Sequence, residues 1–159
     1  MPFLSTPLTV LATSSVIGSA WISGSIGALS ISTIPAILQS GARGDGLVQA
    51  WHTQFSRSLY IPSTAVIAAL NYFYLAYRHR SVRREWRGYA AAGAANLLLV
   101  PFTLIFIAGI NSQLIASRVD HLSFVTAGKL IKKWGDLNFY RIFMPLAGAA
   151  LGLWNLLSG

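Results

Sequence analysis

The sequence predicts an all-α fold, a four-helix bundle that spans a membrane. Its composition is one reason, because 54% of the 159 residues are hydrophobic and only 10% are charged, whereas about a quarter of a soluble domain is usually charged. The distribution of charge is the other. Four stretches contain no Asp, Glu, Lys or Arg: 1–42, 58–77, 88–117 and 142–159. Each reaches or approaches the roughly 20 residues that a helix needs to cross a bilayer.

The first predicted span covers residues 8–37. Two stripes of small residues recur along it at every fourth position: Ala20, Gly24 and Ala28, and Ser19, Ser23 and Gly27. Small residues let helix backbones approach closely in lipid. We therefore expect the stripes to form a helix-packing seam, and a groove for a substrate is the alternative.

A polar connection and a short helix, 47–58, precede the second predicted span, 59–77. Pro62 falls in the first turn of this span, where a proline loses no hydrogen bond. A basic loop follows, with the arginines Arg78, Arg80, Arg83, Arg84 and Arg87. Arginine beside a membrane span favours the cytosolic side, so we predict that this loop and both termini face the cytosol.

The third predicted span, 88–111, contains Pro101, which frees a backbone carbonyl that a neighbour must satisfy. Asn96 and Thr103 are the nearest candidates. Residues 111–128 show the least regular pattern, and an amphipathic stretch then leads into the fourth span, 140–157. Short connections favour an antiparallel bundle, which makes residues 1–159 a single transmembrane domain.

Several classes of protein are excluded by what the sequence lacks. Cysteine is absent, so there is no disulfide framework and no Cys zinc site. The net charge of +8 resides in loops between apolar spans, where lipid headgroups are a better partner than nucleic acid. The four acidic residues lie outside the spans and lack metal-ligand spacing. We therefore expect no metal and no conventional bound cofactor.

Two polar residues near the spans are candidates for chemistry, because such groups are expensive in a membrane and often functional. His52 follows Trp51 in the short helix, and imidazole exchanges protons near neutral pH. A histidine at the headgroup level without a role is the alternative. Asn111 closes the third predicted span, either as a hydrogen-bond donor or as a cap of the helix.

A third candidate is the set Trp134, Asn138 and Arg141. Their spacings of four and three residues place them on one face of a helix. Arg141 has two alternative positions. It either extends to lipid headgroups or turns inward as a fixed positive charge.

Short motifs occur in a specific order along the second half of the chain. They are Pro101-Phe102-Thr103, then Asn111 with Leu114, then Trp134-Gly135-Asp136-Leu137-Asn138 followed by Arg141. This pattern resembles the anthrone oxygenase family, also called DUF1772. The resemblance covers nearly the whole chain and is most specific from Pro101 to Gly152.

The resemblance implies a membrane enzyme that oxidises an anthrone-type polyketide to an anthraquinone, with molecular oxygen as co-substrate and no cofactor. His52 would be the base, and Asn111, Asn138 and Arg141 would donate hydrogen bonds to the developing oxyanion. An aromatic slot would bind the apolar substrate. Its walls would be Trp51, Tyr72, Tyr74, Phe102 and Trp134.

The alternative function is a non-enzymatic membrane scaffold, assembly factor or lipid-binding protein. Its polar residues would join helices, and the bundle would be packed without room for three fused rings. Under either function the chain is an integral, multi-pass membrane protein, of the endoplasmic reticulum in a fungus or of the inner membrane in a bacterium. Membrane lipid is a partner, and a second copy of the chain is a further candidate.

Overall fold

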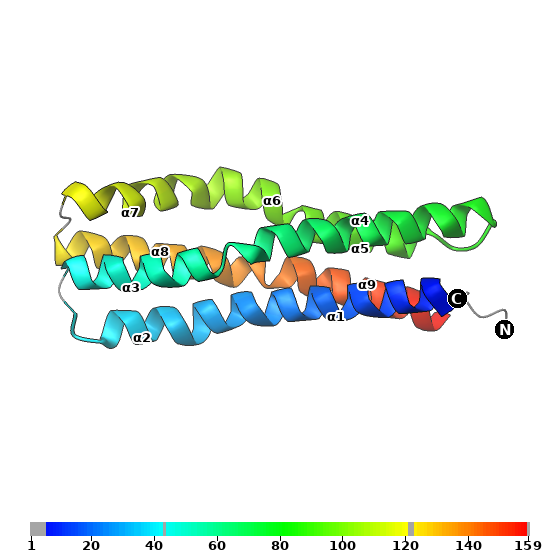
Figure 1. Cartoon of the computed structure of the whole chain (residues 1–159), viewed down its shortest axis with the longest axis horizontal. Coiled ribbons are helices and arrows are strands. Elements are labelled where there is room, and N and C mark those ends of the chain that lie inside the picture. Colours follow the sequence, from blue (N-terminus) through cyan, green and yellow to red (C-terminus); the bar gives the residue numbers. More distant parts are fainter. Residues whose placement is uncertain (1–5, 43, 121–122, 159) are drawn as a thin grey trace.

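Four long helical rods lie side by side in the computed structural model, which describes residues 6–42, 44–120 and 123–158 (Figure 1). Each rod is a series of consecutive helices. They are α1 (Thr6–Ala28), η1 (Leu29–Thr33) and α2 (Ile34–Gln39); α3 (Gly44–Arg57) and α4 (Tyr60–Ser81); α5 (Arg87–Leu97), α6 (Leu99–Phe102), η2 (Thr103–Ile107) and α7 (Ala108–Asp120); and α8 (Phe124–Arg141) and α9 (Phe143–Ser158). The predicted all-α four-helix bundle is confirmed.

Successive rods run in opposite directions. The start of α1, the end of α9 and the arginine-rich loop between α4 and α5 therefore share one end of the bundle (Figure 1). The opposite end holds the connections from α2 to α3 and from α7 to α8. The predicted placement of the two ends of the chain on the same side as the arginines agrees with this topology.

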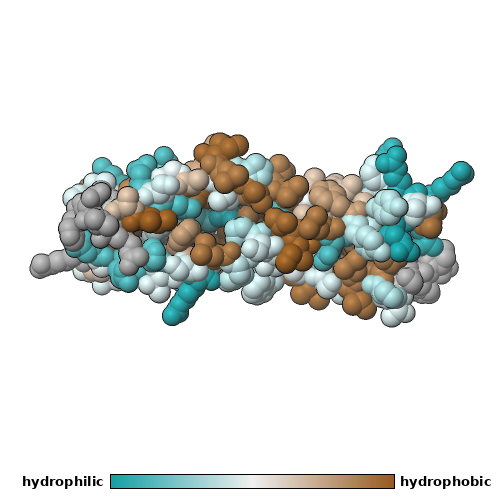
Figure 2. Space-filling model, turned by 45° about the horizontal axis from the view of Figure 1, so that its top comes forward, coloured by the Kyte–Doolittle hydropathy of each residue, from teal (hydrophilic) through white to brown (hydrophobic). Residues whose placement is uncertain are grey.

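Three of the rods are long and apolar enough to cross a membrane: Thr6–Gln39, Asp45–Ser81 and Arg87–Ser117. They contain 34, 37 and 31 residues, more than the roughly 20 that the hydrocarbon layer requires. Figure 2 shows apolar side chains gathered over the middle of the bundle and hydrophilic ones projecting at its ends. The chain is a membrane protein.

The third rod continues past Asn111, so the expectation that the helix ends there is wrong. α7 runs from Ala108 to Asp120. The reason is that buried residues recur at helical spacing along α7: Ile110, Leu114 and Ser117. They give this largely polar helix a face that packs inside the bundle.

Of the two small-residue stripes in α1, only one lies inside the bundle. Ser19 and Ser23 are buried, and the Ser23 hydroxyl donates to the Ile142 carbonyl at 3.0 Å. The stripe of Ala20, Gly24 and Ala28 is exposed, and a side chain at Gly24 would meet no atom within 4 Å. The packing-seam prediction is thus correct for the stripe that contains Ser19 and Ser23 and wrong for the stripe of Ala20, Gly24 and Ala28.

Pro101 lies just before the third rod changes from α-helical to π-helical hydrogen bonding. Asn96 and Thr103, the predicted partners of the carbonyl that Pro101 frees, form their hydrogen bonds with other groups. Thr103 Oγ1 donates to the Leu99 carbonyl at 2.6 Å, and Asn96 Nδ2 donates to the Ala92 carbonyl at 2.9 Å. The residues after Pro101 form the five-residue π-helical turn η2. Such turns are frequent at functional sites.

Glycines allow α9 to approach α4 and α5 closely. A side chain at Gly148 would clash with Asn96 and lie 3.1 Å from the Ala92 carbonyl oxygen, and one at Gly152 would clash with the Tyr72 hydroxyl. Neither neighbour is free to move, because Asn96 and Tyr72 are both fully buried. The glycines thus fix the distance between these helices, as small residues do in membrane bundles.

We expect Gly148→Val to destabilise the bundle by about 1–3 kcal/mol, the usual effect of overpacking a core. Thermal unfolding in detergent measures this, at roughly 2–4 °C per kcal/mol for a chain of this size. Gly24→Val is the matched control, because it introduces the same side chain at an exposed helical glycine. Equal melting temperatures for the two variants would contradict the close packing of α9.

Candidate active site

A chain of three hydrogen bonds runs along the inner face of α8, and the first of them joins α8 to α7. Trp134 Nε1 donates to Asn111 Oδ1 at 2.8 Å, and Asn138 Nδ2 donates to the Trp134 carbonyl at 2.8 Å. Arg141 Nη1 donates to Asn138 Oδ1 at 2.7 Å. Trp134, Asn138 and Arg141 therefore lie on one face of α8, as predicted, and this face points into the bundle. Asn111 contacts it from the neighbouring rod.

Arg141 lies inside the bundle rather than at lipid headgroups. It is 6% exposed, and its Nε has no hydrogen-bond partner. Among the residues that the structure describes, no Asp or Glu forms an ion pair with it. A buried cation with an unsatisfied donor destabilises a fold, which makes Arg141 a candidate for a functional role.

A cavity of about 50 Å³ lies beside this cation. Its polar part consists of Arg141, Asn138, Asn111, Thr103 and Ser58; its apolar part consists of Leu29, Phe55, Leu59, Ile61, Pro62, Ile107 and Trp134. All four rods contribute. Leu59 is 57% exposed, so the cavity opens to the outside of the bundle at the break between α3 and α4.

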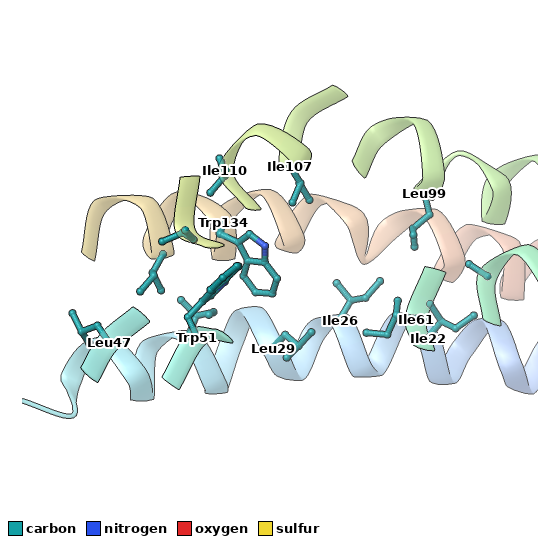
Figure 3. Close-up of a cluster of buried hydrophobic side chains, with 14 of the residues drawn as sticks. Ile22, Ile26, Leu29, Leu47, Trp51, Ile61, Leu99, Ile107, Ile110 and Trp134 are labelled. Carbon is teal, nitrogen blue, oxygen red and sulfur yellow. The ribbon is translucent and has the colours of Figure 1, made fainter. Parts of the chain in front are cut away.

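Aromatic side chains pack beside the cavity, toward the α2–α3 end of the bundle. Trp51 is fully buried and stacks on Phe55 with ring centroids 5.0 Å apart. Its ring also meets the edge of Trp134, with centroids 6.0 Å apart. Figure 3 shows the two tryptophans between α3 and α8, with Leu29 and Ile107 nearby. Of these three rings, those of Phe55 and Trp134 line the cavity.

Three of the predicted site residues lie near the cavity without lining it: Trp51, His52 and Phe102. His52 is half-buried on α3, one turn before the cavity-lining Phe55, with its ring edge-on to Trp51 at 6.4 Å. Phe102 packs against the core around Trp134, and its ring lies 4.8 Å from that of Phe106.

The structure does not bring the predicted tyrosines to this site. Tyr72 belongs to a second buried cluster in the other half of the bundle, where its ring stacks with Tyr89 at 6.3 Å. Tyr74 is 46% exposed, and its hydroxyl accepts a hydrogen bond from Arg78 at 3.0 Å. Both lie ten or more residues beyond Pro62 on one helix, which is about 15 Å or more along its axis.

Sequence reasoning missed Phe55, Ser58 and Ile107 as residues of the site. Two prolines in the sequence could have indicated these residues. Pro62 follows the break between α3 and α4, and Pro101 precedes the π-helical turn η2. Residues of the break and of the π-helical turn both line the cavity.

No group of three or more His, Cys, Asp or Glu side chains that could hold a metal ion exists among the described residues. What the site offers instead is a desolvated positive charge and amide groups at the end of an apolar pocket. Such a site stabilises an anion that forms next to a hydrophobic molecule.

We expect Trp134→Phe to lower the free energy of unfolding by about 1–3 kcal/mol, because Asn111 Oδ1 loses its donor while the ring packing is largely kept. Thermal unfolding again measures the effect. Trp154→Phe is the control, since Trp154 is 72% exposed. If both variants melt alike, the bond between Trp134 and Asn111 contributes nothing to stability.

Comparison with known proteins agrees with the sequence motifs. A family model described as anthrone oxygenase matches residues 51–151. Monooxygenase hypC of Dothistroma septosporum is 30% identical over 144 residues, which is 87% of this chain and 78% of that protein. Anthrone oxygenase AgnL2 of Paecilomyces divaricatus is 30% identical over 158 residues, 91% of this chain and 96% of that protein.

A third relative, noranthrone monooxygenase of Aspergillus flavus, is 27% identical over 145 residues, 87% of this chain and 69% of that protein. No solved structure matches. The matched segment 51–151 begins at Trp51 and includes every polar residue of the cavity.

Proposed function

The chain belongs to the anthrone oxygenase family, and on that premise we propose that it is a membrane-embedded oxygenase that converts an anthrone-type polyketide to an anthraquinone with O2. The observation that carries the proposal is the buried cation Arg141 in the wall of a cavity whose lining is mostly apolar. A scaffold was expected to leave no room for three fused rings, and this cavity by itself has none. The family match and a buried cation without a carboxylate partner among the described residues favour the enzyme, because carbanions and oxyanions need such a charge nearby.

The reaction balances as anthrone plus O2 giving anthraquinone plus water. A base removes one proton from the central methylene, and the resulting carbanion passes one electron to O2. The carbon radical and superoxide combine to form a C–O bond. The peroxide anion takes up a proton, and loss of the second methylene proton together with hydroxide gives the new carbonyl and water.

Arg141 and Asn111 are the proposed electrostatic groups. Negative charge develops on the carbanion and then on oxygen, and preorganised donors in a desolvated site stabilise such charge strongly. Asn138 positions Arg141, because its Oδ1 accepts from the guanidinium. Trp134 positions Asn111 in the same way through its indole N–H.

The substrate enters from the membrane in this proposal. An apolar tricyclic molecule partitions into lipid, and the cavity opens beside the exposed Leu59. Phe55 and Pro62 flank that opening, and Trp51 stacks on Phe55. Aromatic and apolar walls suit a flat ligand, with Phe102 behind them as part of the same core.

His52 remains the proposed proton acceptor. Among the described histidines, it is the one in the same half of the bundle as the cavity, because His79 packs against Tyr89 beside the arginine-rich loop. The positive charge of Arg141 makes the methylene proton of the substrate more acidic, so a weak base such as imidazole is sufficient to remove it. His52 reaches substrate bound at the opening rather than inside the cavity.

We propose that no resident metal, flavin or nicotinamide takes part, since the carbanion itself can reduce O2. Purified protein in detergent should oxidise an anthrone under air, with one O2 consumed per quinone formed, and dialysis against a chelator should leave the rate unchanged. Oxygen-electrode and absorbance measurements test both points. Loss of turnover on chelation, restored by one metal, would contradict the metal-free reaction; no turnover at all would favour a scaffold.

We also propose that the arginine-rich loop faces the cytosol, in the endoplasmic reticulum of a fungal host or the inner membrane of a bacterial one. The chain contains no cysteine, so single cysteines report sidedness cleanly. Ser81→Cys should react with a membrane-impermeant maleimide added from the cytosolic side. Ser40→Cys, exposed at the opposite end, should react only from the other side, and the reverse pattern would invert the orientation.

A further inference from the structure

The cavity beside Arg141 is too small for the substrate that the proposed function assigns to the protein. Its volume is about 50 Å³. A water molecule takes about 30 Å³ of liquid, and a protein cavity of about 150 Å³ holds a benzene ring. Three fused rings therefore do not fit, whereas a molecule of two or three heavy atoms does.

We propose that this cavity is the dioxygen site, which holds O2 and the superoxide and peroxide anions formed from it, while the rings of the substrate stay at the opening beside Leu59. The inference rests on the proposed function and deepens it. It assigns Arg141 to the oxygen atoms of the reaction rather than to the carbonyl oxygen of the anthrone.

The charge of the cavity supports this assignment. Arg141 is 6% exposed, and its Nε–H has no partner although it is buried. Neutral O2 needs no such donor, but superoxide does, because one electron turns an apolar molecule into a desolvated anion. A fixed guanidinium makes that electron transfer more favourable without moving.

The composition of the lining supports it as well. Much of the lining is apolar and includes Leu29, Ile61 and Ile107, and such a surface admits O2 from the membrane. Asn138 holds the guanidinium through Nη1. The cavity thus combines apolar surface for the gas with a positive charge for its reduced form.

The order of events follows from this arrangement. The carbanion at the opening loses one electron and becomes a carbon radical, while O2 in the cavity gains that electron and becomes superoxide. The two combine across the short distance between opening and cavity to form the C–O bond. The peroxide anion beside Arg141 then takes up a proton, and water leaves as the carbonyl forms.

Azide, a linear monoanion of three atoms, is the probe for the site. Its infrared stretching band should shift when azide is added to wild-type protein in detergent, and the shift should be absent from Arg141→Met. In turnover, azide should compete with O2 and not with the anthrone. Absence of a shifted band, or competition with the anthrone alone, would overturn the proposal.

Filling the cavity gives an independent test. Ser58 lines it and Ser56 is exposed on the same helix. Ser58→Val should lower kcat/KM for O2 at least tenfold and leave the anaerobic Kd of the anthrone unchanged, whereas Ser56→Val should alter neither. A rise in the Kd of the anthrone for Ser58→Val, with kcat/KM for O2 unchanged, would mean that the cavity receives the rings instead.

These experiments separate the failure of this inference from failure of the proposed function. If the protein does not oxidise anthrones, the infrared band of bound azide still reports whether Arg141 forms a site for a small anion. If the protein does oxidise anthrones and azide does not bind beside Arg141, the proposed enzymatic function is supported and the proposed dioxygen site is contradicted.

Discussion

Arg141→Met is expected to lower turnover by about 10²–10³-fold, the usual effect of removing one preorganised donor from an anion site, or about 3–4 kcal/mol of barrier. Methionine fills much of the same volume without charge. The melting temperature should change little, because two effects oppose each other. Removal of a buried cation stabilises the fold, whereas Asn138 Oδ1 loses its donor and destabilises it.

Arg141→Lys tests geometry in the same assay. Lysine keeps the charge but replaces the planar fork by a point charge, so its turnover should lie between those of the wild type and Arg141→Met. Arg57→Met is the control, because Arg57 is exposed at the end of α3. Wild-type turnover in Arg141→Met would remove the electrostatic role of this residue.

His52→Ala is expected to lower turnover by about 10²–10⁴-fold, as loss of a general base typically does, or roughly 3–5 kcal/mol of barrier. The melting temperature should stay close to that of the wild type, because His52 is half-buried and contributes little packing. Added imidazole should restore part of the activity, a rescue that a structural role of the histidine would not produce.

Gln49→Ala is the control for His52→Ala, since Gln49 is exposed one turn earlier on α3. Full activity of His52→Ala would show that the methylene proton leaves by another route, through a tyrosine or through hydroxide at the membrane surface. The cavity itself contains no carboxylate or imidazole among its lining residues, so such a route would lie at its opening.

The position of His52 shows where sequence reasoning about the site stops. The short helix and its histidine were visible in the sequence, and so was the adjacent Trp51. The structure places Trp51 in the core and His52 at its edge, because the inward face of α3 continues through Trp51, Phe55 and Ser58. Which of two neighbouring residues faces the core depends on how the helix is rotated against its partners.

Features that depend on local periodicity and on charge can be predicted from the amino-acid sequence. The uncharged stretches fixed the number of rods, since a charge in hydrocarbon is expensive wherever the helix packs. The spacing of Trp134, Asn138 and Arg141 fixed their common face, because 3.6 residues per turn is a property of the helix alone.

Contacts between one rod and another depend on the tertiary structure. It brought Asn111 to Trp134 across 23 residues, turned one stripe of α1 inward and the other outward, and left Tyr72 and Tyr74 far from the cavity. It also placed the break after α3 opposite Arg141. These outcomes depend on the rotation and axial offset of each rod, which are set by close packing of side chains such as Asn96 against Gly148 and have no counterpart in the periodicity of a single helix.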